Sequence, residues 1–127
     1  MAWAEPNFSR EEVNAAARRV TAALDQDWSQ WTTDDWLSYE RAVEVVGNWR
    51  SCHGYPLNTF QVNLRQSARR IDQGALVAQR TKRLVSIALK LQRFPKMKLT
   101  QMQDIGAAAL WYPPPPMLTA FLITIKK

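Results

Sequence analysis

The 127 residues are enough for one domain with a hydrophobic core, since 46% of them are apolar and 22% are charged. The formal net charge of +6 favours anionic partners such as nucleotides, RNA or a ribosomal surface, and we expect neither DNA nor a membrane as a partner. The single cysteine, Cys52, excludes an internal disulfide and fits a reducing cytosol. We see no signal peptide, and the apolar run near residues 118–125 is too short to span a bilayer, so we expect a soluble, cytoplasmic protein.

Two helices are predicted in the first part of the chain. A capping box formed by Ser9 and Glu12 begins the first helix, which continues to about Leu24. Thr33 or Asp34 is expected to cap the second helix. Its large apolar residues recur at helical spacing and are Trp36, Tyr39, Val43, Val46 and Trp49. We expect the nearby tryptophans to pack these helices and not to form a stacking surface for bases.

Two further helices are predicted beyond a break at Gly54-Tyr55-Pro56. Asn58 is expected to cap the third helix, whose inward-facing residues are Phe60, Leu64, Ala68 and Ile71. After a short turn at Gln73-Gly74, a basic helix is predicted from about Ala75 to Arg93, where Phe94-Pro95 stops it.

The basic helix has two chemically different faces. Its polar residues fall within about 80° of one another at the helical repeat and are Lys82, Ser86, Lys90 and Arg93. The apolar residues on the opposite side are Leu84, Ile87 and Leu91. A cationic, hydroxyl-bearing stripe backed by a buried apolar stripe suits the triphosphate of a nucleotide, although a solvated helix face is the alternative interpretation. The carboxylate of Asp104 could hold the metal ion that a triphosphate carries.

The end of the chain differs in character from the rest. Residues 98–103 are expected to form a connector, and Ile105 to begin a strand. After Gly106, an alanine-rich run is followed by four consecutive prolines at residues 113–116, which favour an extended spacer. We therefore divide the chain into residues 1–106 and a tail of residues 107–127.

Residues 43–106 contain several spaced motifs. They are Asn48-Trp49-Arg50 with His53, Tyr55-Pro56-Leu57-Asn58, the Arg-x-Lys-Arg-x-x-Ser-Ile-x-x-Lys-Leu-x-Arg segment of residues 80–93, and Met97-Lys98-Leu99 leading into Met102-Gln103-Asp104-Ile105-Gly106. In this order they closely resemble the RelA/SpoT-type synthetases of the stringent response. These enzymes make the alarmones (p)ppGpp by moving pyrophosphate from ATP to the 3′-hydroxyl of GDP or GTP. The resemblance implies a mainly α chain that is the N-terminal helical portion of an α/β nucleotidyltransferase-like domain, cut at its first strand.

The resemblance also implies roles for six residues. Arg80 resembles the family arginine that stacks on the adenine of ATP. The residues similar to those that grip the ATP phosphates are Lys82, Ser86, Lys90 and Arg93. Asp104 resembles the carboxylate that binds Mg²⁺, the cofactor implied together with the partners ATP and GDP or GTP. Homo-oligomers and contacts with the ribosome or RNA are further expectations.

The sequence departs from the family after Gly106. The family continues with Gly-Cys-Arg-Ala-Val-Val, whose arginine helps to sandwich the adenine, whereas this chain has Ala109 at that position. The 127 residues contain no counterpart of the family's acceptor-binding tyrosine loop or of its catalytic glutamate. We therefore expect no catalytic residue to be retained and at most ATP binding to survive. Codons allowed for the tail, read one base out of register, can encode the family motif, which favours truncation by a frameshift.

The competing hypothesis is a non-catalytic basic module that binds RNA or the ribosome, or that regulates an intact synthetase. Residues 65–98 contain ten Lys or Arg and one acid, Asp72. Aromatic residues are not interleaved with the cations between Arg65 and Arg93, which argues against a platform for single-stranded RNA. For His53 beside Cys52 we favour a structural role over metal binding, because there is no second histidine and no cysteine pair.

Overall fold

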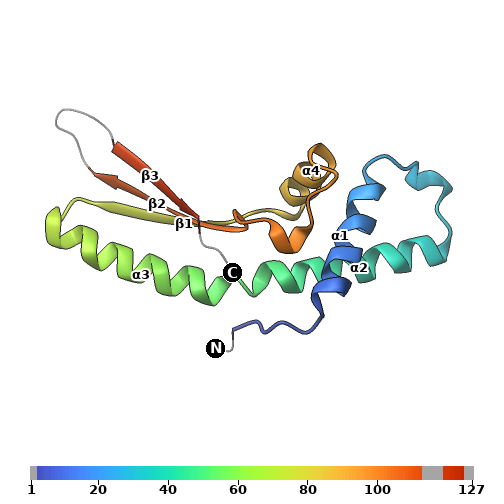
Figure 1. Ribbon diagram of the computed structural model, residues 1–127, viewed down its shortest axis with the longest axis horizontal. Coiled ribbons are helices and arrows are strands. Elements are labelled where there is room, and N and C mark those ends of the chain that lie inside the picture. Colours follow the sequence, from blue (N-terminus) through green and yellow to red (C-terminus); the bar gives the residue numbers. More distant parts are fainter. Residues whose placement is uncertain (1–2, 113–118, 125–127) are drawn as a thin grey trace. The chain divides into compact units, whose positions relative to one another are not determined.

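A computed structural model describes residues 3–112 and 119–124, and the chain divides into two compact units (Figure 1). The helical unit consists of Met1–Cys52 and Arg83–Met102. The sheet unit consists of His53–Lys82 and Gln103–Lys127. None of the helices in the described ranges is both long enough and apolar enough to cross a membrane.

The helical unit contains three helices, α1 (Arg10–Ala23), α2 (Thr33–Ser51) and α4 (Leu84–Arg93), and two short 3₁₀ helices, η1 (Trp28–Gln30) and η2 (Leu99–Gln101). α1 packs against both α2 and α4. The residues buried in this unit include Val13, Ala17, Val20, Ala42, Val46, Ile87, Leu91 and Leu99. Small residues on α1 let its neighbours approach closely, and the aliphatic residues supply most of the buried apolar area.

Side-chain caps begin α1 and α2. Of the capping box predicted for α1, the structure shows the bond in which the Ser9 hydroxyl accepts from the Glu12 backbone N–H at 3.1 Å. The prediction for α2 is wrong by one or two residues, because Thr32 and not Thr33 or Asp34 is the cap. The Thr32 hydroxyl accepts from the Asp35 N–H at 3.3 Å, and the Asp35 carboxylate accepts from the Thr32 N–H at 2.9 Å. This reciprocal pair fixes the start of the helix.

Four aromatic rings pack together at the start of α2. The rings belong to Trp28, Trp31, Trp36 and Tyr39, and in five of the six pairs the centroids lie 4.7 to 6.0 Å apart. The guanidinium carbon of Arg19 on α1 lies 4.8 Å from the centroid of the Trp31 ring. The cluster joins α1 to α2, as the packing interpretation predicted.

The sheet unit is a long helix, α3 (Gly54–Ile71), on one face of a three-stranded antiparallel sheet (Figure 1). The strands are β1 (Leu76–Thr81), β2 (Gly106–Tyr112) and β3 (Thr119–Thr124), in the order β1-β2-β3. The buried residues Ala68, Ala75 and Leu110 form a core cluster between helix and sheet, and Leu64 and Val77 pack against it.

α3 begins earlier than predicted. The Gly54-Tyr55-Pro56 segment does not break the chain but forms the first turn of the helix, and Asn58 is therefore not its cap. A proline is tolerated in the first turn because backbone N–H groups there have no partner within the helix. The prediction that Ile71 faces inward is also wrong, since 78% of this residue is exposed at the end of α3.

The prediction of one helix from Ala75 to Arg93 is wrong in its first half. The six residues of β1 pair antiparallel with β2, from Leu76 opposite Trp111 to Thr81 opposite Gly106. Arg83 is extended (φ −67°, ψ 151°), and α4 begins only at Leu84. The local hydrogen bonds of a helix are thus replaced by a ladder with a partner strand about 30 residues away in the sequence, and no local pattern indicates such a partner.

The chain is mainly helical, as predicted, but it does not stop at its first strand. The strand expected from Ile105 is β2, and β1 precedes it. β3 and most of β2 lie in the tail of residues 107–127. The proline spacer expected at residues 113–116 lies outside the described residues.

Replacement of Asp35 by Asn should change how stability depends on pH. Hydrogen bonds from the Thr32 backbone and hydroxyl lower the pKa of Asp35. A folded-state pKa below the unfolded value of about 3.9 stabilises the fold above that pH, and the contribution is lost as the pH falls through the folded-state pKa. The free energy of unfolding of Asp35→Asn should therefore be below that of the parent chain at pH 6, and the difference should shrink below pH 4.

The control for this measurement is Asp34→Asn. It removes a charge from the same helical turn without removing the reciprocal bonds of Thr32 and Asp35. Urea denaturation from pH 6 to pH 3 should give the two variants different pH profiles. Identical profiles would show that the capping box of Thr32 and Asp35 stabilises the fold only through the charge of its carboxylate.

Candidate functional site

The six residues predicted to bind a nucleotide fall into two groups, one in each unit. Arg80, Lys82 and Asp104 belong to the sheet unit. The other group lies on α4 of the helical unit and consists of Ser86, Lys90 and Arg93. The prediction that Lys82 shares a helix face with the α4 residues is wrong, because Lys82 directly follows β1 and precedes α4.

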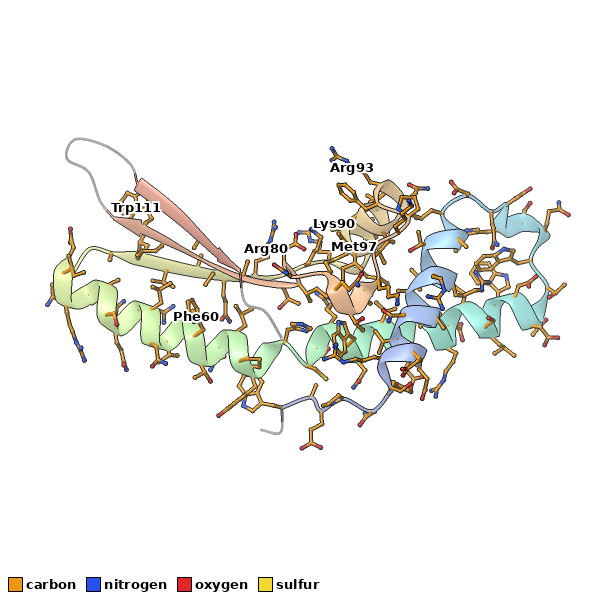
Figure 2. All side chains as sticks on the ribbon, viewed as in Figure 1. Phe60, Arg80, Lys90, Arg93, Met97 and Trp111 are labelled. Carbon is orange, nitrogen blue, oxygen red and sulfur yellow. The ribbon has the colours of Figure 1, made fainter. Side chains whose placement is uncertain are left out.

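Arg80 lies on the face of the sheet that α3 does not cover. Val77 on β1 packs into the cluster beneath α3, so Arg80, three residues later, lies on the opposite face by the two-residue alternation of a strand. Figure 2 shows its side chain on the side of the sheet away from α3. Its partner on β2 is Ala107, whose methyl group leaves space for the arginine. Arg80 is exposed and can contact a ligand on this face.

Lys82 and Asp104 form an ion pair where the β1–β2 ladder ends. The Lys82 Nζ atom lies 3.1 Å from the Asp104 Oδ2 atom. The ladder holds the two residues together, because the Lys82 backbone N–H donates to the Ile105 carbonyl oxygen at 2.6 Å. The exposed fractions of the side chains are 15% for Lys82 and 35% for Asp104, so both charges are partly withdrawn from water.

α4 has the two faces that the sequence predicts. Ser86, Lys90 and Arg93 follow at intervals of four and three residues and lie within about 60° of one another. The opposite face is buried, and its residues Ile87, Ala88 and Leu91 are 2%, 3% and 6% exposed. Since that face packs against α1, the polar stripe of α4 is directed away from this core.

Arg93 lies at a hollow that the sequence analysis missed. Its guanidinium carbon lies 5.4 Å from the centroid of the Phe94 ring. The hollow measures about 590 Å³ and is lined by Arg93, Phe94, Pro95, Lys96, Met97 and Gln101. The sequence analysis treated Phe94 only as part of a helix stop. The available signal for this hollow was Phe94, an aromatic residue that directly follows the last cation of the motif and precedes Lys96 by two positions.

The carboxylate of Asp104 is the candidate metal ligand that the motifs identify. The described ranges contain no group of three or more His, Cys, Asp or Glu side chains that could hold a metal ion. Mg²⁺ is usually held by one or two carboxylates together with phosphate oxygens and water. Asp104 fits that pattern only when a phosphate supplies the remaining oxygen ligands. His53 is buried at the N-cap position of α3, which is a structural position.

No model of a known protein family matches the chain, and no curated protein is significantly similar to it. The resemblance to RelA/SpoT-type synthetases therefore rests on the motifs and their order.

A double-mutant cycle should show that Lys82 and Asp104 are energetically coupled. Removal of either side chain leaves the other charge partly buried without this partner, so we expect a coupling energy of about 1 kcal/mol from Lys82→Ala, Asp104→Ala and the double variant. The matched control is the pair Arg41–Glu44, which has the same 3.1 Å separation but exposed fractions of 60% and 63%. Urea denaturation should give a smaller coupling for the control, about 0.3 kcal/mol. Equal couplings for the two pairs would contradict the partial burial of Lys82 and Asp104.

Proposed function

We propose that the chain is the ATP-binding part of a RelA/SpoT-type alarmone synthetase domain. The observation that carries the proposal is the ion pair between Lys82 and Asp104, with Arg80 two residues before Lys82 on β1. The family resemblance assigns phosphate, metal and adenine contacts to these three residues. Their proximity in one unit is what a nucleotide site requires, because base, phosphates and metal ion are parts of one ligand.

The ion pair gives the free site a balanced charge. Without a nucleotide, the Lys82 ammonium and the Asp104 carboxylate neutralise each other at 3.1 Å. A triphosphate and its Mg²⁺ offer each group a better partner: phosphate oxygens for Lys82, and the metal ion for Asp104. Separation of a partly exposed pair costs only about 1 kcal/mol, which charge-assisted hydrogen bonds to phosphate can offset.

The proposal explains why the metal and the nucleotide would bind together. One carboxylate alone does not supply enough oxygen ligands for Mg²⁺. Asp104 would therefore hold the ion jointly with phosphate oxygens and water. When bound, the ion neutralises phosphate charge. Lys82 would contribute a second positive charge, and Arg80 would stack on the adenine. Phosphoryl transfer depends largely on such positioning and charge neutralisation.

The proposal also assigns the sheet unit to the start of an α/β nucleotidyltransferase-like domain. In the sequence, β1 is followed by α4 and then by β2. All six residues of β1 pair with β2. β2 carries Ala109 where the family has its second adenine-binding arginine. The adenine would thus have Arg80 on one side only, and we expect weaker ATP binding than in a complete family site. A frameshift remains our proposed origin of the tail.

ATP binding should depend on Arg80 and Lys82. Titration calorimetry with Mg-ATP should give a dissociation constant that rises about tenfold or more in Arg80→Ala and Lys82→Ala, because each loses a charged contact. Asp104→Asn should weaken binding of Mg-ATP more than binding of ATP in the presence of EDTA. Arg70→Ala is the matched control, since Arg70 is exposed on α3 of the same unit. A separate variant, Lys90→Ala, tests the role assigned to the α4 stripe.

Equal binding by parent, Arg80→Ala and Lys82→Ala would overturn the nucleotide site. A salt-sensitive shift of RNA with no ATP binding would favour the non-catalytic RNA-binding module. Incubation of the 127-residue chain with ATP, GDP and Mg²⁺ should yield no ppGpp, because these residues include no counterpart of the acceptor loop or the catalytic glutamate. Sustained ppGpp formation would contradict that expectation.

A further inference from the structure

The helical unit contains a cavity that none of the six predicted residues lines. It measures about 440 Å³. One wall is α1 from Asn14 onward together with Asp25, and the other is the end of α4 with residues 95–99. Pockets that bind small organic ligands usually measure about 300 to 1,000 Å³, so the volume suits a ligand of this kind.

The base of the cavity is apolar. Its lining includes Ala17, Leu91 and Leu99, which are 3%, 6% and 1% exposed. These three residues belong to the core of the unit, and their outward atoms line the cavity. A flat or aliphatic group placed there would be removed from water at a gain of about 25 cal/mol per Å² of apolar surface.

Hydrogen bonds fix the distance between the two walls. The Asn14 side chain donates to the Thr100 hydroxyl at 3.1 Å and accepts from the Thr100 backbone N–H at 3.1 Å. At the other end of the cavity, the Gln92 amide donates to the Asp25 carboxylate at 3.0 Å. α1 is thus tied to α4 and to η2, and the cavity is already formed in the free chain.

The rim of the cavity is cationic. Arg18, Lys96 and Lys98 line it and are exposed, whereas Asp25 is the single acid in the lining. Within residues 3–112 and 119–124, no ion pair is seen for these three cations. Three cations against one carboxylate leave an excess of positive charge over an apolar base.

We propose that this cavity binds an amphipathic organic anion, with its apolar body on Ala17, Leu91 and Leu99 and its anionic group at Lys96, Lys98 and Arg18. The lining contains no aromatic side chain on which a nucleotide base could stack. The ligand proposed here, an anion with an apolar body, is of a different class from the nucleotide proposed for Arg80, Lys82 and Asp104. The site is independent of the proposed function.

The probe for this site is 8-anilinonaphthalene-1-sulfonate, which combines an apolar ring system with one sulfonate. Its fluorescence should rise saturably on titration with the full chain, at a stoichiometry of one. Ala22→Trp should abolish this binding, because Ala22 lines the cavity but is itself exposed, so the indole can occupy the space without a core residue being changed. The double variant Lys96→Ala/Lys98→Ala should weaken binding about tenfold and reduce its dependence on salt.

Two further measurements keep the test decisive. In amide NMR spectra, the probe should shift the side-chain NH₂ signals of Asn14 and Gln92, and the spectrum of Ala22→Trp should retain the dispersion of a folded chain. Lys90→Ala, on the other stripe of α4, should bind the probe as the parent does. Undiminished binding by folded Ala22→Trp, or several probe molecules bound without saturation, would overturn the proposal.

Discussion

The pairing of β1 with β2 is the constraint on which the sheet unit depends. It turns residues 76–81 into a strand, directs Arg80 to the face that α3 leaves open, and brings Lys82 to Asp104. Without this pairing, the segment that precedes α4 would be free to continue that helix toward its N-terminus. The ladder therefore decides both the fold of this segment and which charged groups meet.

Patterns of neighbouring residues were sufficient to predict a helix where its own residues determine its start and its buried face. Ser9 and Glu12 identify the start of α1, and the apolar spacing of α4 identifies its buried face. β1 was missed because its identity depends on a partner strand some 30 residues away. The predicted break at Gly54-Tyr55-Pro56 was wrong for a different reason. Glycine and proline break a helix in its interior but are tolerated in its first turn.

The candidate site was predictable in residue type but not in geometry. The motifs singled out Lys82 and Asp104 separately, and their contact follows only from the register of the strands. The hollow beside Phe94 and the cavity on α1 were missed altogether. The cavity is lined by segments near residues 14–25 and 91–99, whose proximity depends on how α1 and α4 pack. Packing of that kind leaves no pattern in a single sequence.

β1 is one of the two outer strands of the sheet, with β2 on one side only among the described strands. Outer strands expose backbone groups to which another chain can add, and proteins commonly protect them with charged side chains. Arg80 is the charged residue of this strand, between Gln79 and Thr81. Its positive charge therefore has a second consequence, which is to discourage intermolecular strand addition. A neutral replacement at this position would make self-association at high protein concentration easier, whereas lysine would preserve the protection.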